Sequence, residues 1–155
     1  MRDSESVTKL RTLPADTWEQ GRYENGWNAR QILAHIASIE WAYPRLIDVA
    51  RAAAAPKPAD SAAAGSGASS MPGGIDDYNT RQVAKRADAS VSDLISEFEA
   101  NRAKTIQAVA GAEDSLFTVP IRSAGGVSGP LASVLNYIAV LHVEQHIRDI
   151  AGQDA

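Results

Sequence analysis

The chain has 155 residues, of which 45% are hydrophobic, and this is enough for the core of one domain of ordinary size. We therefore expect a single domain over residues 1–155. The formal net charge is −4, with charged residues spread along the chain, so a nucleic-acid partner is not expected. There is no cysteine, which excludes disulfides, a catalytic thiol and cysteine-based metal sites.

Membrane and export signals are not evident in the sequence. No segment approaches the ~20 uninterrupted apolar residues of a membrane span. The first ten residues, MRDSESVTKL, contain no apolar stretch of the kind found in secretory signals. The simplest expectation is a cytoplasmic protein with no membrane partner.

Helical spacing of apolar residues dominates the first third of the chain. A short helix is expected over residues 4–18, with a break at Pro14. A long helix is expected over residues 28–53, with Asn28 as its N-cap. Pro44 should kink this helix because proline removes a backbone donor and crowds the preceding turn.

Residues 55–74, APKPADSAAAGSGASSMPGG, have a different composition. They are small and nearly devoid of large apolar groups, which predicts a flexible connection. The sequence leaves open whether this is a plain surface loop or a lid over a pocket. A short helix is expected from Asp76, and a longer one from a capping box of Ser90 and Asp93 to Gly111.

The last part of the chain predicts one more long helix. Residues 112–127 are expected to be loop, with a short extended piece at 117–119. Residues 128–130, Ser-Gly-Pro, should open a helix that is apolar around most of its circumference, therefore deeply buried, and ended by Gly152. Three long helices and a shorter N-terminal one, without convincing alternation of period two, predict an all-α four-helix bundle.

All three histidines of the chain fall on helix faces that should be buried. His142 and His146 are about 40° apart around the helix axis, so their imidazoles can converge on one ion at about 2.1 Å. His35 lies among the isoleucines of the other long apolar helix. A buried histidine is more often a hydrogen-bonded core residue than a ligand, but apolar surroundings offer three of them few partners. The pattern therefore predicts a divalent metal ion bound between the helices.

Three protein ligands leave at least one position open for water or substrate, which is typical of a catalytic site. Imidazole ligands suit zinc, nickel, copper or iron(II), and we expect zinc or nickel first, with iron as an alternative. Asp149 is a candidate acceptor for the second ring nitrogen of His146, although an exposed carboxylate near the helix end is equally consistent. Glu144 should point away from His142 and is not expected to be a ligand.

Three segments match motifs that occur together in one family, in the right order. Residues 26–43, GWNARQILAHIASIEWAY, resemble W-[ST]-x-x-[DE]-x-[LV]-x-H-L, with Asn28 and Gln31 as departures. Residues 75–109 resemble D-x-x-N…R…S-x-x-[DE]-L…R, and residues 131–150 resemble a closing helix with H-x-x-x-H-x-x-x-I. The chain thus resembles the DinB/YfiT-like metal-binding four-helix bundles. This superfamily includes the N-terminal domain of mycothiol-dependent maleylpyruvate isomerase and the bacillithiol and mycothiol S-transferases.

The resemblance places a metal triad on His35, His142 and His146. The maleylpyruvate isomerases have a glutamate where this chain has His142, so the all-histidine set is more similar to the thiol-transferase branch. They also carry a second, C-terminal domain, whereas this chain ends at Ala155. Isomerase activity is therefore not expected.

The resemblance also implies a homodimer and marks two further positions, Asn79 and Arg102. Each can line a pocket that binds the substrate, or tie helices together. Trp27 and Trp41 are interpreted as core or dimer contacts rather than as substrate platforms.

These features favour a metal-dependent S-transferase that activates a low-molecular-weight thiol and joins it to a small electrophile. The alanine- and arginine-rich, lysine-poor composition indicates a high-GC organism, in which mycothiol is the expected thiol. Two alternatives remain open. One is a metal-dependent hydrolase or detoxification enzyme that uses a metal-bound hydroxide. The other is a non-enzymatic, stress-related bundle whose metal is structural or absent.

Overall fold

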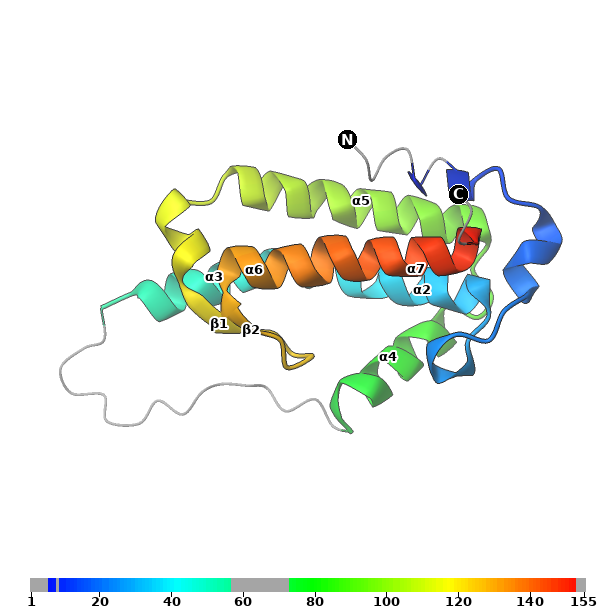
Figure 1. The fold of residues 1–155 in the computed structure, drawn as a ribbon, viewed down its shortest axis with the longest axis horizontal. Helices are drawn as coiled ribbons and strands as arrows, with labels where there is room; N and C mark the ends of the chain where they lie inside the picture. The colour runs from blue at the N-terminus through cyan, green and yellow to red at the C-terminus, as the bar shows by residue number, and fades with distance from the viewer. Residues whose placement is uncertain (1–5, 8, 57–72, 153–155) are drawn as a thin grey trace.

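The computed structural model describes residues 6–7, 9–56 and 73–152, and this part of the chain is mostly helical (Figure 1). Helices α2, α5 and α7 run side by side along the long axis, with α3 continuing the line of α2. The helices are α2 (Ala29–Glu40), α3 (Pro44–Ala54), α4 (Gly74–Lys85), α5 (Val91–Ala110), α6 (Leu131–Leu135) and α7 (His142–Ala151).

Shorter elements connect these helices. A π-helical turn joins α6 to α7, α4 packs on α2, and a two-stranded sheet precedes α6. The short helical elements are Ala15–Glu19, Glu24–Gly26, Asp114–Thr118 and the π-helical Asn136–Leu141. The all-α bundle predicted from the sequence is confirmed. Among the described residues, no helix has both the length and the apolar character needed to cross a bilayer.

The N-terminal segment is less regular than the helix expected over residues 4–18. Residues 6–7 and 9–10 are helical, the chain then turns, and a 3₁₀ helix follows Pro14. The break at Pro14 is therefore confirmed. Most of the connection predicted at residues 55–74 lies outside the described residues.

Helix α2 begins where expected because Asn28 caps it. The Asn28 side-chain oxygen accepts from the Gln31 amide at 2.9 Å, and the Gln31 side chain accepts from the Asn28 amide at 2.9 Å. This reciprocal capping box shows that Gln31 performs the capping for which the related motif has an acid. The helix ends at Glu40, however, and Pro44 occupies the first turn of α3. Pro44 thus starts a new helix instead of kinking one.

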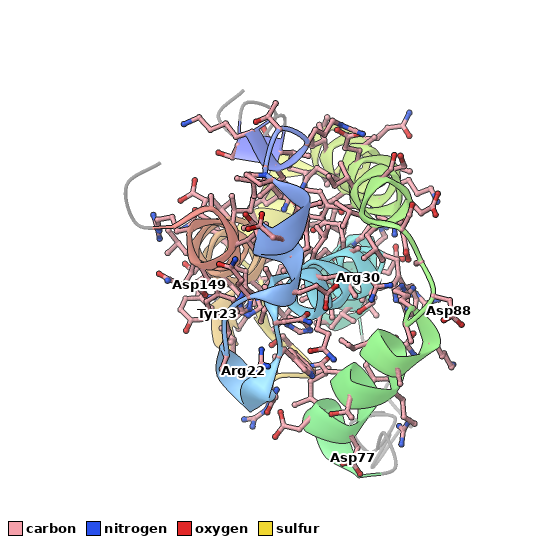
Figure 2. All side chains as sticks on the ribbon, turned by 90° about the vertical axis from the view of Figure 1, so that its right-hand side faces the viewer. Arg22, Tyr23, Arg30, Asp77, Asp88 and Asp149 are labelled. Carbon is pink, nitrogen blue, oxygen red and sulfur yellow. The ribbon has the colours of Figure 1, made fainter. Side chains whose placement is uncertain are left out.

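Helices α4 and α5 meet at a connection that α2 holds in place. Ser90 and Asp93 form the predicted capping box, with the Asp93 amide 3.1 Å from the Ser90 hydroxyl, and Gly111 ends α5 as expected. Arg30 extends from α2 and donates to the main-chain carbonyls of Arg86 and two alanines after it (Figure 2). The alanines are Ala87 and Ala89. One guanidinium therefore fixes the path of the chain between two helices.

The segment before the last helix forms an antiparallel hairpin of β1 (Pro120–Arg122) and β2 (Ser128–Pro130). The extended piece predicted at 117–119 is therefore placed too early, because a 3₁₀ helix runs to Thr118. The last helix does open at the predicted proline, since Pro130 is its N-cap and the helix begins at Leu131, but residues 128–130 themselves are strand. Strands of three residues are too short for an alternation of period two to be visible in the sequence.

The last helix changes its winding immediately before His142. Its central turn is π-helical, and the Tyr43 hydroxyl donates to the Ile138 carbonyl in this turn at 3.1 Å. Tyr137 and Leu141 are 54% and 48% exposed. The prediction that the last helix is deeply buried around its circumference is therefore wrong for this turn. Single π-turns inside α-helices are frequent beside functional sites.

Two clusters of buried apolar side chains form the core. The larger one joins the N-terminal segment to α2, α4, α5 and α7, and the smaller one joins α3, the hairpin and α6. Glu40, at the end of α2, also forms an ion pair with Arg102 of α5. The Arg102 Nε atom lies 3.1 Å from the Glu40 carboxylate, and the two side chains are 10% and 0% exposed.

Removing the Glu40 carboxylate should strongly destabilise the bundle. We expect Glu40→Gln to cost about 3 kcal/mol or more, because Arg102 then stays buried without its counter-charge. Arg102→Met in the same chain should restore part of the loss. Urea unfolding followed by circular dichroism measures both changes. Arg11→Ala removes an exposed pair with Glu99 and should cost less than about 1 kcal/mol. Equal losses for Glu40→Gln and Arg11→Ala would contradict this prediction.

Candidate metal centre

The three histidines meet in the interior where α2 packs against α7. His35 lies in the middle of α2, while His142 opens α7 and His146 follows one turn later. One nitrogen from each ring lies within 4.8 Å of those from the other two. Within the described part of the chain, this is the one group of three or more metal-ligating side chains close enough to share an ion.

The rings face one another edge-on. The interplanar angles are 84° and 89° between His35 and the other two rings, and 75° between His142 and His146. The Nε2 atoms of His142 and His146 are 3.0 Å apart. Two nitrogens at about 2.1 Å from one ion are separated by about 3.0 Å at a right angle and about 3.4 Å in a tetrahedron. The observed spacing therefore fits two ligands of one ion.

His35 supplies a second observation that fits a metal. Its Nδ1 atom is buried and has no hydrogen-bond partner in the part of the chain that the structure describes, and its neighbours on α2, Ile32 and Ile36, are fully buried apolar residues. A buried polar atom normally has a partner, so an orphaned ring nitrogen requires an explanation. Three imidazoles without a carboxylate form a donor set that suits zinc, nickel, copper or iron(II). The residues present therefore fit a divalent ion.

The protonation of the rings also favours metal binding. Burial, together with the charges of His146 and His142, lowers the pKa of His35 from 6.5 to about 3. Burial and the neighbouring His146 lower the pKa of His142 to about 4. Both rings are thus neutral at pH 7, the form in which imidazole binds a metal.

Comparison with known proteins agrees with the fold and the motifs. Residues 4–150 match the model of the DinB superfamily. The chain belongs to the DinB superfamily. No curated protein and no solved structure matches it. The resemblance drawn from three sequence segments is therefore confirmed over nearly the whole chain. In this DinB bundle, the positions that the resemblance marked for a metal carry side chains that can hold one.

Asp149 lies where an acceptor for His146 is needed. Its Oδ2 atom is 3.6 Å from the His146 Nδ1 atom, and its Oδ1 atom accepts from the Gln145 side chain at 2.9 Å. The His146 ring thus turns Nε2 toward His142 and Nδ1 toward a carboxylate, the division of roles usual in metal-binding histidines. The 3.6 Å separation is longer than a hydrogen bond, so the role of Asp149 as an acceptor stays a prediction. Glu144 is not among the grouped ligands, as expected.

The two candidate substrate-binding residues lie outside the histidine group. The guanidinium of Arg102 is paired with Glu40 and lies 5.2 Å from the centre of the Phe98 ring. This places Arg102 in a contact between α2 and α5. The Asn79 side-chain oxygen, on α4, is buried and has no hydrogen-bond partner among the described residues. A substrate role for Asn79 and Arg102 stays a prediction.

Trp27 has a closer relation to the site than the sequence indicated. It is buried, as expected for a core residue, and its ring centre lies 5.2 Å from that of His35. The signal for this contact is the position directly before the N-cap Asn28, from which a side chain packs back onto the helix. Trp41 is 36% exposed, with the Arg45 guanidinium 4.1 Å from its ring centre, so it is not a core residue.

Replacing His142 should remove the metal and leave the fold intact. His142 is half-buried, so His142→Ala leaves a smaller defect than the same change at the fully buried His35. We expect bound metal to fall from about one ion per chain to a small fraction of that, measured by elemental analysis after dialysis. Arg148→Ala, on the exposed face of the same helix, is the control and should keep its metal. Unchanged metal content in His142→Ala would rule out the triad.

The metal-free DinB bundle should lose stability in mild acid. The folded pKa of His35 is about 3, against 6.5 for an unburied imidazole, so between these values only the unfolded chain binds this proton. Above about pH 6.5 this proton uptake does not change the free energy of unfolding. As the pH falls, it lowers the free energy of unfolding by a growing amount, roughly 1–2 kcal/mol at pH 5. Urea unfolding in a chelator at both pH values measures it. His35→Gln should flatten the dependence, and an unchanged slope in His35→Gln would contradict the assignment.

Proposed function

We propose that this DinB protein binds one divalent ion on His35, His142 and His146 and transfers a low-molecular-weight thiol, of the mycothiol type, to a small electrophile. Zinc or nickel is the proposed metal, with iron as the alternative. The observation that carries the proposal is the convergence of three imidazoles from two helices with no carboxylate among them. Three ligands leave room for a further one, as in catalytic rather than structural sites.

The charge of the donor set favours an anionic ligand at the open position. Since all three protein ligands are uncharged in their binding form, the site keeps the full charge of the ion. A carboxylate in place of His142 would neutralise part of that charge. A bound divalent ion lowers the pKa of a coordinated thiol toward neutrality, which supplies a thiolate nucleophile. The chain has no cysteine, so this sulfur has to enter as a cosubstrate.

The exposure of the three rings supports an approach from one side. His35 and His146 are 5% and 4% exposed, whereas His142 is half-buried. The Trp27 ring lies beside His35, with 5.2 Å between the ring centres. A small molecule therefore reaches the site from the His142 side. In the transfer, sulfur forms a bond to the electrophilic carbon, the leaving group departs with its bonding electrons, and the thiol proton passes to solvent.

The same donor set also serves a hydrolase, in which water takes the place of the thiol. No contact in the described residues favours water over a thiol, and the absence of cysteine is equally compatible with both reactions. Dependence on added thiol distinguishes the two. From the family resemblance we propose a homodimer that acts on small molecules. From the composition we propose a cytoplasmic location, with neither nucleic acid nor membrane as partner. Light scattering on the purified protein tests the dimer.

Turnover should require both a metal and a thiol. We expect zinc- or nickel-loaded protein to join mycothiol to chlorodinitrobenzene, a reaction that can be monitored by the absorbance of the product. The rate of this reaction should fall to background when the metal is chelated and in His142→Ala. Saturating thiol should also raise the melting temperature of the loaded protein, since a ligand at about 100 Kd contributes about 2.7 kcal/mol.

The matched control is the same electrophile without thiol. Release of chloride at an unchanged rate without thiol would overturn the transferase proposal and favour the hydrolase. A loaded protein that shows neither turnover nor a thermal shift with any thiol would favour the non-enzymatic alternative.

A further inference from the structure

A short loop, residues 21–27, lies at the end of the bundle where α2 begins and α7 ends (Figure 2). It is tightly folded, because the Tyr23 amide donates to the Trp27 carbonyl at 2.8 Å and the Gly26 amide donates to the Tyr23 carbonyl at 2.9 Å. Asn25 adopts a left-handed conformation with φ of 61°, which closes the turn. The loop therefore presents Tyr23 and Trp27 in a fixed relation to each other.

Tyr23 ties this loop to the last turn of α7. Its hydroxyl donates to the main-chain carbonyl of Asp149 at 2.5 Å, a contact between residues 126 positions apart (Figure 2). Helix α7 ends at Ala151, so this carbonyl is one of the last four, which have no amide partner within the helix. The Tyr23 hydroxyl thus supplies a donor that the helix itself cannot.

The residue that Tyr23 holds is the one that faces His146. The Asp149 carboxylate lies 3.6 Å from the His146 Nδ1 atom, while the opposite nitrogen of that ring faces His142. At the other end of the same loop, the Trp27 ring lies against His35. One loop therefore contacts both helices that carry the three histidines.

The sequence of the loop is adapted to this placement of Tyr23. Gly21 has a φ of +87°, and a Cβ atom there would lie 2.5 Å from the Tyr23 ring. Any other residue would have both to strain the backbone and to push the ring away. Glycine at position 21 thus leaves the space that the Tyr23 ring occupies.

We propose that Tyr23 is a positioning residue of the metal site, acting through Asp149 on the orientation of the His146 ring. The proposal rests on the metal binding proposed above. The hydroxyl anchors the last turn of α7, and the anchored turn keeps the Asp149 carboxylate 3.6 Å from Nδ1. The negative charge of this carboxylate favours the ring orientation in which Nδ1 faces it and Nε2 faces the shared site. Partners of this kind typically change metal affinity by about 10- to 100-fold when they are lost.

The test is the removal of one hydroxyl. Tyr23→Phe should weaken zinc binding about tenfold or more, measured by competition with a chromophoric chelator. It should also change the visible absorption spectrum of the cobalt(II)-loaded protein, because that spectrum reports the geometry of the ligands. Gly21→Ala, which keeps the hydroxyl but displaces the ring, should cause the same two changes.

Tyr43→Phe is the matched control. It removes another tyrosine-to-carbonyl hydrogen bond to the last helix, at Ile138, but does not touch Asp149. We expect its cobalt spectrum and zinc affinity to stay within about twofold of the parent. Equal losses of zinc affinity in Tyr23→Phe and Tyr43→Phe would overturn the proposal, because they would show that both variants weaken binding only by destabilising the fold. Parent-like affinity and spectrum in Tyr23→Phe would overturn it as well. Failure of the parent chain to bind zinc or cobalt would instead overturn the proposed function.

Discussion

The burial of three imidazoles at one contact between helices is the constraint on which the rest of this structure depends. Imidazole is polar, so enclosing His35 and His146 in an apolar core is costly unless each ring nitrogen has a partner. Burial also lowers the pKa of His35 and His142, which keeps those rings uncharged and available as ligands. The same packing that would penalise isolated histidines thus prepares them for an ion.

The surrounding elements can be understood as supports of this arrangement. The capping box at Asn28 fixes the start of α2 and places Trp27 against His35. The π-helical turn between α6 and α7 ends directly before His142. At the far end, Tyr23 anchors the last turn of α7. Rigid supports of this kind matter because metal ligands act only when they are held within a few tenths of an ångström.

Features set by neighbouring residues could be predicted from the sequence. The caps at Asn28 and Ser90 and the helix end at Gly111 depend on contacts within one turn, and all three are confirmed. The convergence of the histidines followed from helical periodicity and family motifs. Contacts between distant segments could not be found this way. The pair of Glu40 and Arg102, and the bond from Tyr23 to Asp149, become visible only once the helices are packed.

The coordination of the bound metal tests the central claim most directly. X-ray absorption at the metal edge of the protein loaded with one equivalent of zinc reports the number and type of its ligands. We predict three imidazole nitrogens at about 2.0–2.1 Å and at least one further light atom at the open position. Fewer imidazoles, or a shell made mainly of carboxylate oxygens, would contradict it.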